Sequence, residues 1–153
     1  MSSYTFWPLS DGDIADIIYF LRQQKPVEPV PRTYEIPFSS RIKLLRGVWK
    51  LSADQVDKSR PRWGNFPRDT SHDRGRYLAA IVCAECHGAN YQGDPLEGGP
   101  SLSVLAIYDA DEFSRLMKAG LSQAGQPVEP MWWLPEVGFT DQDISDLYLF
   151  LTK

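Results

Sequence analysis

The sequence of 153 residues contains few of the residues that build several common kinds of site. With two cysteines and two histidines, a structural zinc centre, which usually has four Cys or His ligands, would need all of them. No apolar run reaches the roughly 20 residues that span a bilayer, and the N-terminus lacks the basic and apolar regions of a secretory signal peptide. We find no strand pattern, which argues against a βαβ redox protein and predicts an all-α fold.

Charge is distributed unevenly along the chain. Residues 72–153 contain five Lys and Arg against twelve Asp and Glu, a net charge of −7, whereas residues 1–71 have a net charge of +3. An acidic C-terminal half argues against a nucleic acid partner. It suits a partner protein with a basic docking surface, although acidic residues also serve solubility alone.

Both cysteines lie in the stretch Cys83-Ala84-Glu85-Cys86-His87, which has the spacing C-x-x-C-H. Each thiol can form a thioether with one haem vinyl group, and the adjacent histidine can reach the iron from the same turn. The motif therefore predicts one covalently bound haem c, attached through Cys83 and Cys86 with His87 as an axial ligand. A zinc site completed by His72, or dithiol chemistry, remains as an alternative.

The spacing of apolar residues and capping signals predicts several helices. They cover residues 11–24, 39–51, 73–82, 111–119 and 141–151. The helix over 39–51 is basic and amphipathic, with Ile42, Leu45 and Trp49 on one face. Such a helix either packs against its own domain or lies on a membrane surface or a partner. Prolines predict extended chain over 25–37, and irregular structure is expected over 52–70 and 121–138.

Two of the predicted helices are similar in sequence. Residues 9–21 align with residues 139–151 at a constant offset of 130, and six of the thirteen positions are identical. Both segments have a Ser or Thr at the N-cap and an aspartate three residues later. The match indicates an internal repeat rather than two unrelated helix starts.

Residues 72–153 resemble a class I cytochrome c domain. The matching pieces are a helix leading into residues 83–88, the segment Gly99-Pro100-Ser101-Leu102, a Pro-Met loop at Met131 and the closing helix. The resemblance implies a cytochrome c fold with a first helix, a haem loop, a middle helix, a methionine loop and a closing helix, here preceded by an N-terminal helical extension. It also implies that small residues of the first helix admit an aromatic side chain of the closing helix. The residues concerned are Gly75, Ala79, Tyr148 and Phe150.

The resemblance also implies the ligands of the haem iron. The carbonyl of Pro100 is expected to bind the second ring nitrogen of His87, and Met131 is expected to be the sixth ligand. The other candidates for that position are Met1, Met117 and His72; Met117 lies in a pattern typical of a buried core. Trp132 and Trp133 next to Met131 are expected either to line the haem pocket and its rim or to pack within the loop.

Ligation by His87 and Met131 leaves no open position on the iron and raises its reduction potential. The expected function is therefore one-electron transfer, not catalysis. The alternative is a haem enzyme or a ligand-sensing cytochrome with a displaceable sixth ligand, which would need an acid–base residue such as Glu85 or Glu129.

A weaker resemblance covers the N-terminal half. A closing helix, a proline connector and Ile36-Pro37-Phe38 look like the segment between domains in multi-haem cytochrome subunits of membrane-bound, periplasm-facing dehydrogenases. It implies a dehydrogenase or terminal oxidase as redox partner, a periplasmic or periplasm-facing location and peripheral membrane contact through residues 39–51.

We expect three segments on this basis: residues 1–24 as the closing helix of a preceding, truncated cytochrome domain, residues 25–71 as a connector, and residues 72–153 as the haem domain. The apolar face of the first helix would then cover a helix and haem that this chain lacks. We expect that face to be buried on residues 39–51 or in a dimer, or to remain exposed. Its residues are Ile14, Ile17, Ile18 and Leu21.

Overall fold

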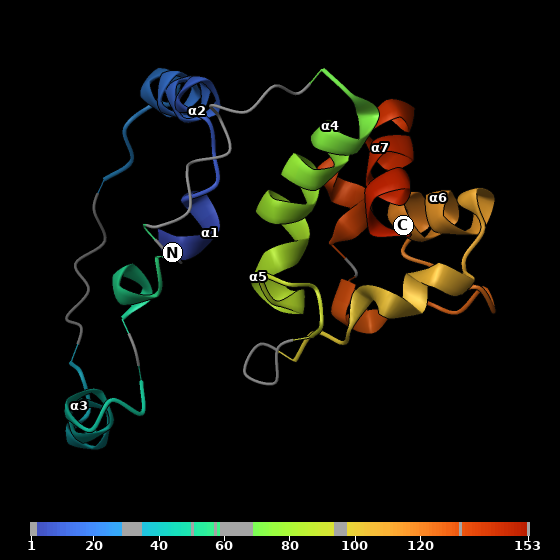
Figure 1. Ribbon diagram of the computed structural model, residues 1–153. Coiled ribbons are helices and arrows are strands. Elements are labelled where there is room, and N and C mark those ends of the chain that lie inside the picture. Colours follow the sequence, from blue (N-terminus) through green and yellow to red (C-terminus); the bar gives the residue numbers. More distant parts are fainter. Residues whose placement is uncertain are drawn as a thin grey trace. The chain divides into compact units, whose positions relative to one another are not determined.

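The structure, a computed structural model, describes residues 3–28, 35–49, 51–56, 58, 69–93, 98–131 and 133–152. All regular elements of this part of the chain are helical, apart from one isolated antiparallel bridge between Leu121 and Pro127. The prediction of an all-α protein is thus confirmed. The chain divides into two compact units, Met1–Asn65 and Phe66–Lys153, which Figure 1 shows in blue to teal and in green to red. No helix among the described residues is long and apolar enough to cross a membrane.

Among the described residues, the elements of the first unit are α1 (Ser3–Phe6), α2 (Asp11–Gln23), α3 (Phe38–Leu45) and the 3-10 turn η1 (Ser52–Gln55). The start of α2 follows from its cap, because the Ser10 hydroxyl accepts the Asp13 backbone N–H at 2.9 Å. None of the side chains of α2 is buried, and Ile17 is 43% exposed. Among the described residues the apolar face of α2 is thus mostly exposed, although Ile14 is half-buried, and burial of this face in a dimer stays a prediction.

The prediction of a helix over 39–51 was wrong at its C-terminal end. Helix α3 ends at Leu45, because Gly47 adopts a left-handed φ of 67°. The N–H of Val48 then donates to the Lys43 carbonyl and that of Gly47 to the Leu44 carbonyl, a motif that ends many helices. Trp49 lies beyond the helix, where its ring stacks under the Lys43 ammonium at 4.9 Å.

The second unit holds a continuous helix made of three parts, α4 (Ser71–Leu78), the π-helical turn η3 (Ala79–Cys83) and α5 (Ala84–His87). It starts earlier and runs further than the predicted span of 73–82. It is followed by η4 (Leu102–Ile107), α6 (Ala110–Ala119), η5 (Glu129–Met131), η6 (Leu134–Val137) and α7 (Asp141–Leu151). The middle and closing helices match their predicted spans within one residue, whereas the 3-10 turns η4, η5 and η6 were not predicted.

Helices α4 and α7 lie side by side in the second unit and approach most closely at Gly75 (Figure 1). A Cβ atom on Gly75 would lie 1.9 Å from the backbone oxygen of Asp146 and 2.9 Å from the Cβ of Phe150. The expectation that a small residue here admits an aromatic residue of the closing helix is confirmed for Phe150. Tyr148 instead points toward the α6 side, where its hydroxyl donates to the Tyr108 carbonyl at 3.0 Å.

The core of the second unit forms where α6, η4 and η6 pack around α7. Helix α6 is held in place by two caps: a reciprocal capping box between Asp109 and Glu112, and Gly120 in a left-handed conformation at its end. The helix then presents one apolar face to α7. The buried residues of this core are Ala79, Leu102, Leu105, Phe113, Leu116, Met117, Leu134, Ile144 and Leu147.

An ion pair between the partly exposed Arg74 and the buried Asp146 joins α4 to α7 beside this contact. The Nε atom of Arg74 donates to Asp146 Oδ2 at 2.7 Å, and the Asp146 side chain is fully buried. Burial by itself would raise the pKa of the Asp146 carboxyl. Hydrogen bonds from Arg74 and Gln142, and a third from Ser71, outweigh burial and hold that pKa below its usual range.

The Arg74→Met variant tests the ion pair. It leaves the Asp146 carboxylate buried without its cation, so we expect the free energy of unfolding at pH 7 to fall by roughly 1–3 kcal/mol. Because the folded-state pKa of Asp146 is lowered, the wild-type pair stabilises fully above the unfolded pKa of about 4, and this stabilisation is lost as the pH falls from there through the lower folded-state pKa. In the variant, burial without the cation raises the pKa of Asp146, so its carboxyl becomes protonated as the pH falls from 7 to 4 and the unpaired buried charge is removed. The difference in free energy of unfolding between variant and wild type should therefore narrow over this range.

Urea unfolding at several pH values measures this difference. The matched control is Lys118→Met, which removes the exposed partner of the exposed carboxylate Asp141 and should change stability by less than about 1 kcal/mol. An Arg74→Met cost that is equal at pH 7 and pH 4 would contradict this interpretation of the pair.

Candidate haem-binding site

A π-helical turn delivers the cysteine motif at the end of the long helix. The Ala84 backbone N–H donates to the carbonyl of Ala79, five residues earlier, where an α-helix would use the residue four earlier. Such a turn holds one extra residue and often occurs at functional sites. Cys83 closes the π turn, and Cys86 and His87 follow in α5, so all three residues of the motif belong to one rigid element.

The imidazole of His87 is buried and oriented by a single contact. His87 is 6% exposed, and the Nδ1 atom of its ring lies 2.7 Å from the carbonyl oxygen of Pro100. A carbonyl oxygen can only accept, so Nδ1 carries the proton and donates, which leaves the lone pair on Nε2. The expected contact between Pro100 and His87 is present, and it fixes the ring with one nitrogen available to a metal.

Two glycines allow the loop after His87 to return to the helix. A Cβ atom on Gly99 would lie 2.0 Å from the carbonyl oxygen of Cys86, so the backbone before Pro100 lies directly against the motif. The N–H of Gly93 donates to the His87 carbonyl at 2.9 Å, and Gly93 has a left-handed φ of 94°. This close approach holds the carbonyl of Pro100 within reach of the imidazole.

Tyr91 gives the same loop a second attachment. Its N–H donates to the Gly88 carbonyl, and its own carbonyl accepts the N–H of Leu102, both at 2.9 Å. Tyr91 has a φ of 61°, which is uncommon for a residue with a side chain. Its ring lies edge-on to that of Phe150 on α7, with 5.8 Å between centroids. The loop is thus joined to the closing helix as well as to the motif.

The two cysteines are not joined in a disulfide and are partly buried. Burial, and then the neighbouring Cys86, raise the pKa of the Cys83 thiol to about 12, so it is protonated at neutral pH. Among the described residues, no group of three or more His, Cys, Asp or Glu side chains is arranged to hold a metal ion. The zinc alternative therefore finds no support in this part of the chain.

The methionines differ in their surroundings. Met131 is half-buried in η5, where it packs against the same core as Cys83. Its N–H donates to the Val128 carbonyl at 2.8 Å, which holds the end of the loop. Met117 is buried in α6 as part of the core. Of the two methionines, Met131 is the less buried, and it lies at the margin of the core.

The remaining candidates are placed as follows. His72 is exposed at the start of α4, and its ring meets that of Phe150 edge-on at 5.3 Å. Trp133 is half-buried and packs against the core. Met1 and Trp132 lie outside the described residues. Neither expectation for the tryptophan pair is tested for Trp132.

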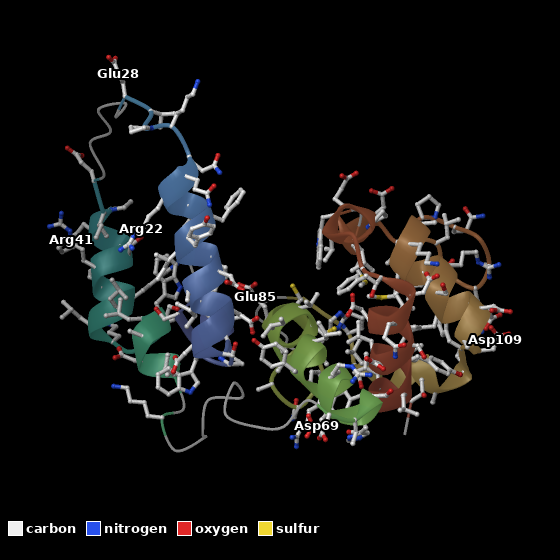
Figure 2. All side chains as sticks on the ribbon, turned by 90° about the horizontal axis from the view of Figure 1, so that it is seen from above. Arg22, Glu28, Arg41, Asp69, Glu85 and Asp109 are labelled. Carbon is white, nitrogen blue, oxygen red and sulfur yellow. The ribbon has the colours of Figure 1, made fainter. Side chains whose placement is uncertain are left out.

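The two carboxylates considered as acid–base groups differ in exposure. Glu85 lies half-buried on α5 and is labelled in Figure 2. Glu129 is exposed at the start of η5. Within the described part of the chain, neither carboxylate has a hydrogen bond or ion pair that would hold it toward His87.

The sequence did not reveal several features of this site. The π turn has no recognisable residue signal, and the contact between Gly99 and Cys86 was not predicted. The Arg74–Asp146 pair joins residues 72 positions apart and was likewise missed. The sequence feature that could have indicated this pair is Arg74 directly before the small Gly75.

Comparison with known proteins identifies the family. Residues 72–153 match the family model for cytochrome c, and because this match covers more than half of the chain, the protein belongs to the cytochrome c family. The predicted family and fold are confirmed. The residues described above fit a c-type haem, since two cysteines that are not joined in a disulfide and an imidazole with a free nitrogen occupy the C-x-x-C-H positions.

A curated relative is the fructose dehydrogenase cytochrome subunit of Gluconobacter japonicus. It is 34% identical over 83 residues, which are 52% of this chain and 16% of that protein. The chain thus matches a small part of its relative's length. A search of the solved structures found no match. Membership of the family supports electron transfer through covalently bound haem c.

The Gly99→Ala variant tests how the loop holds His87. Its new methyl group would collide with the Cys86 carbonyl, so the loop must move and the hydrogen bond from His87 to Pro100 should be lost. We expect a lower yield of haem-loaded protein and an altered absorption spectrum. Gly12→Ala is the control, because Gly12 lies in α2, has no left-handed φ, and a Cβ there would make only an ordinary contact, 3.6 Å from Ser10 Oγ. The same haem content and spectrum in Gly99→Ala and wild type would contradict the proposed role of this loop.

Proposed function

We propose that this protein transfers single electrons through one haem c held by Cys83 and Cys86, with His87 and Met131 as axial ligands. The observation that carries the proposal is the hydrogen bond from His87 Nδ1 to the Pro100 carbonyl at 2.7 Å. It leaves Nε2 as the ligating atom and makes the imidazole a stronger donor to iron. When bound, the haem supplies a one-electron redox couple.

The proposed sixth ligand rests on the environment of Met131. Its side chain lies at the margin of the core that also contacts Cys83, in a short 3-10 turn whose end is fixed by a backbone hydrogen bond to Val128. A thioether favours the reduced iron and fills the last coordination position. The iron would then bind no substrate, which favours electron transfer over catalysis.

The remaining residues would keep the redox site rigid and dry. Helix α4 is tied to α7 through Gly75 and Asp146, and the loop to Pro100 is tied to His87. Rigid attachment keeps the ligands in place in both oxidation states. Apolar surroundings exclude water, which would otherwise compete for the iron.

We propose a dehydrogenase as the electron donor, in a periplasm-facing complex. The similarity to a dehydrogenase cytochrome subunit supports this partner. The net charge of −7 on residues 72–153 supports a docking surface of basic side chains on the partner. A terminal oxidase is the second class of partner that the sequence suggests.

Peripheral membrane contact through residues 39–51 is supported by the exposure of α3. Leu45 is 87% exposed, and Arg41 points outward from the same helix in Figure 2. An exposed apolar side chain beside basic ones is the arrangement that binds an anionic lipid surface. This contact would hold the protein near a membrane-bound partner.

Two methionine variants test the proposed ligand. Met131→Ala should abolish the methionine-to-iron charge-transfer band, lower the reduction potential and let added cyanide or carbon monoxide bind promptly. Met117→Ala should keep the band and destabilise the fold by about 2–5 kcal/mol, because it empties a buried core position. Absorption spectra of both variants measure the difference. Loss of the band in Met117→Ala but not in Met131→Ala would refute the ligand assignment. Prompt ligand binding by wild type would favour the haem enzyme or sensor.

A further inference from the structure

Helix α2 of the first unit has the same N-terminal cap as the closing helix α7 of the cytochrome c unit. In α2 the Ser10 hydroxyl donates to Asp13 Oδ2 at 2.6 Å, and in α7 the Thr140 hydroxyl donates to Asp143 Oδ2 at 2.6 Å. The two helices therefore begin at equivalent positions under the offset of 130 that aligns their sequences. Their residues can be compared one by one.

The residues through which α7 contacts α4 recur in α2. The Asp146 carboxylate accepts a hydrogen bond from the Arg74 side chain. The backbone oxygen of Asp146 and the side chain of Phe150 both lie against Gly75. The equivalent positions of α2 hold Asp16 and Phe20. Both are identical to their counterparts.

The apolar residues on the buried face of α7 also recur at the equivalent positions of α2. Ile144 of α7 is 4% exposed, and its counterpart in α2 is Ile14. Leu147 is fully buried, and its counterpart is the similar Ile17. The aspartate, the phenylalanine and the two buried apolar positions of α7 are thus present on α2, whereas Gln142 and Tyr148 have no counterpart there.

Among the described residues, most of this set in α2 is exposed. Phe20 is 62% exposed and Ile17 is 43% exposed, whereas Asp146 and Leu147 of α7 are fully buried. Asp16 is exposed and has no ion-pair partner among the described residues. An apolar helix face with an unpaired aspartate inside it is complementary to a surface that carries a cation and little side-chain bulk.

We infer that α2 is a docking helix for the first helix of a further cytochrome c unit. That unit is expected to have an arginine that pairs with Asp16 and, directly after it, a glycine that admits Phe20. The helix α4 of this chain has the same two residues, Arg74 and Gly75, but α7 already covers it. The occupant is therefore a cytochrome c unit other than residues 66–153, and α2 takes the place of that unit's closing helix.

A helix exchange in the full chain tests this complementarity. Residues 141–151 are replaced by residues 11–21, which keeps the register of the alignment. We expect a cooperatively folded, haem-loaded protein in which Arg74→Met causes the same loss of stability, with the same narrowing from pH 7 to pH 4, as in wild type. The control exchange uses residues 12–22, because a shift of one residue turns the apolar face by about 100°. It should fail to fold.

A milder exchange covers the case in which the full exchange does not fold. It keeps Gln142 and Tyr148, whose hydrogen bonds to Asp146 and Tyr108 have no counterpart in α2. Failure of this variant too, or equal stability of the in-register and shifted exchanges, would overturn the inference. These readouts are unfolding curves, so they do not depend on which ligands the haem iron has.

Sedimentation of the full chain tests the occupant. The inference expects a monomer at micromolar concentration, because this chain offers no uncovered helix with the Arg-Gly pair. A dimer that the Phe20→Lys variant converts to monomer would show that a second copy occupies the face, and this result would overturn the inference. A monomer in both wild type and Phe20→Lys would support it.

Discussion

The contact between α4 and α7 at Gly75 is the constraint on which the rest of the cytochrome c unit depends. The Asp146 carbonyl occupies the space that a side chain at position 75 would need, so only glycine fits there and the two helices touch through their backbones. The ion pair from Arg74 to Asp146 closes one side of this contact, and Phe150 closes the other. Since Ile144 and Leu147 face the core from the same helix, the contact also fixes where α6 and η6 can pack.

This contact positions the haem site because α4, the π turn and α5 form one helix. Once α4 is fixed against α7, Cys86 and His87 are fixed at its far end. The loop that follows is held twice, by the approach of Gly99 to Cys86 and by the ring of Tyr91 against Phe150. The orientation of the imidazole thus follows from helix–helix contact through a short chain of rigid connections.

Features encoded by short-range signals were predictable from the sequence. The cysteine motif and the closing helix follow from residues close together in a pattern, and the contact of Pro100 with His87 followed from the resemblance to cytochrome c. Features that depend on distant residues were not: Arg74 and Asp146 lie 72 positions apart, and the π turn reflects a shifted backbone hydrogen bond that no residue type marks. The early end of α3 had a local signal in Gly47, which the apolar periodicity of residues 39–51 outweighed in the prediction.

The mass of the denatured protein tests most directly whether Cys83 and Cys86 hold one haem covalently. The chain is produced in a host that attaches haem c and is measured under conditions that release any non-covalently bound group. The wild-type chain should have the mass of the polypeptide plus one haem, and the variant carrying both Cys83→Ala and Cys86→Ala should have the mass of the polypeptide alone. A wild-type chain without haem, or with more than one, would contradict the assignment of this site.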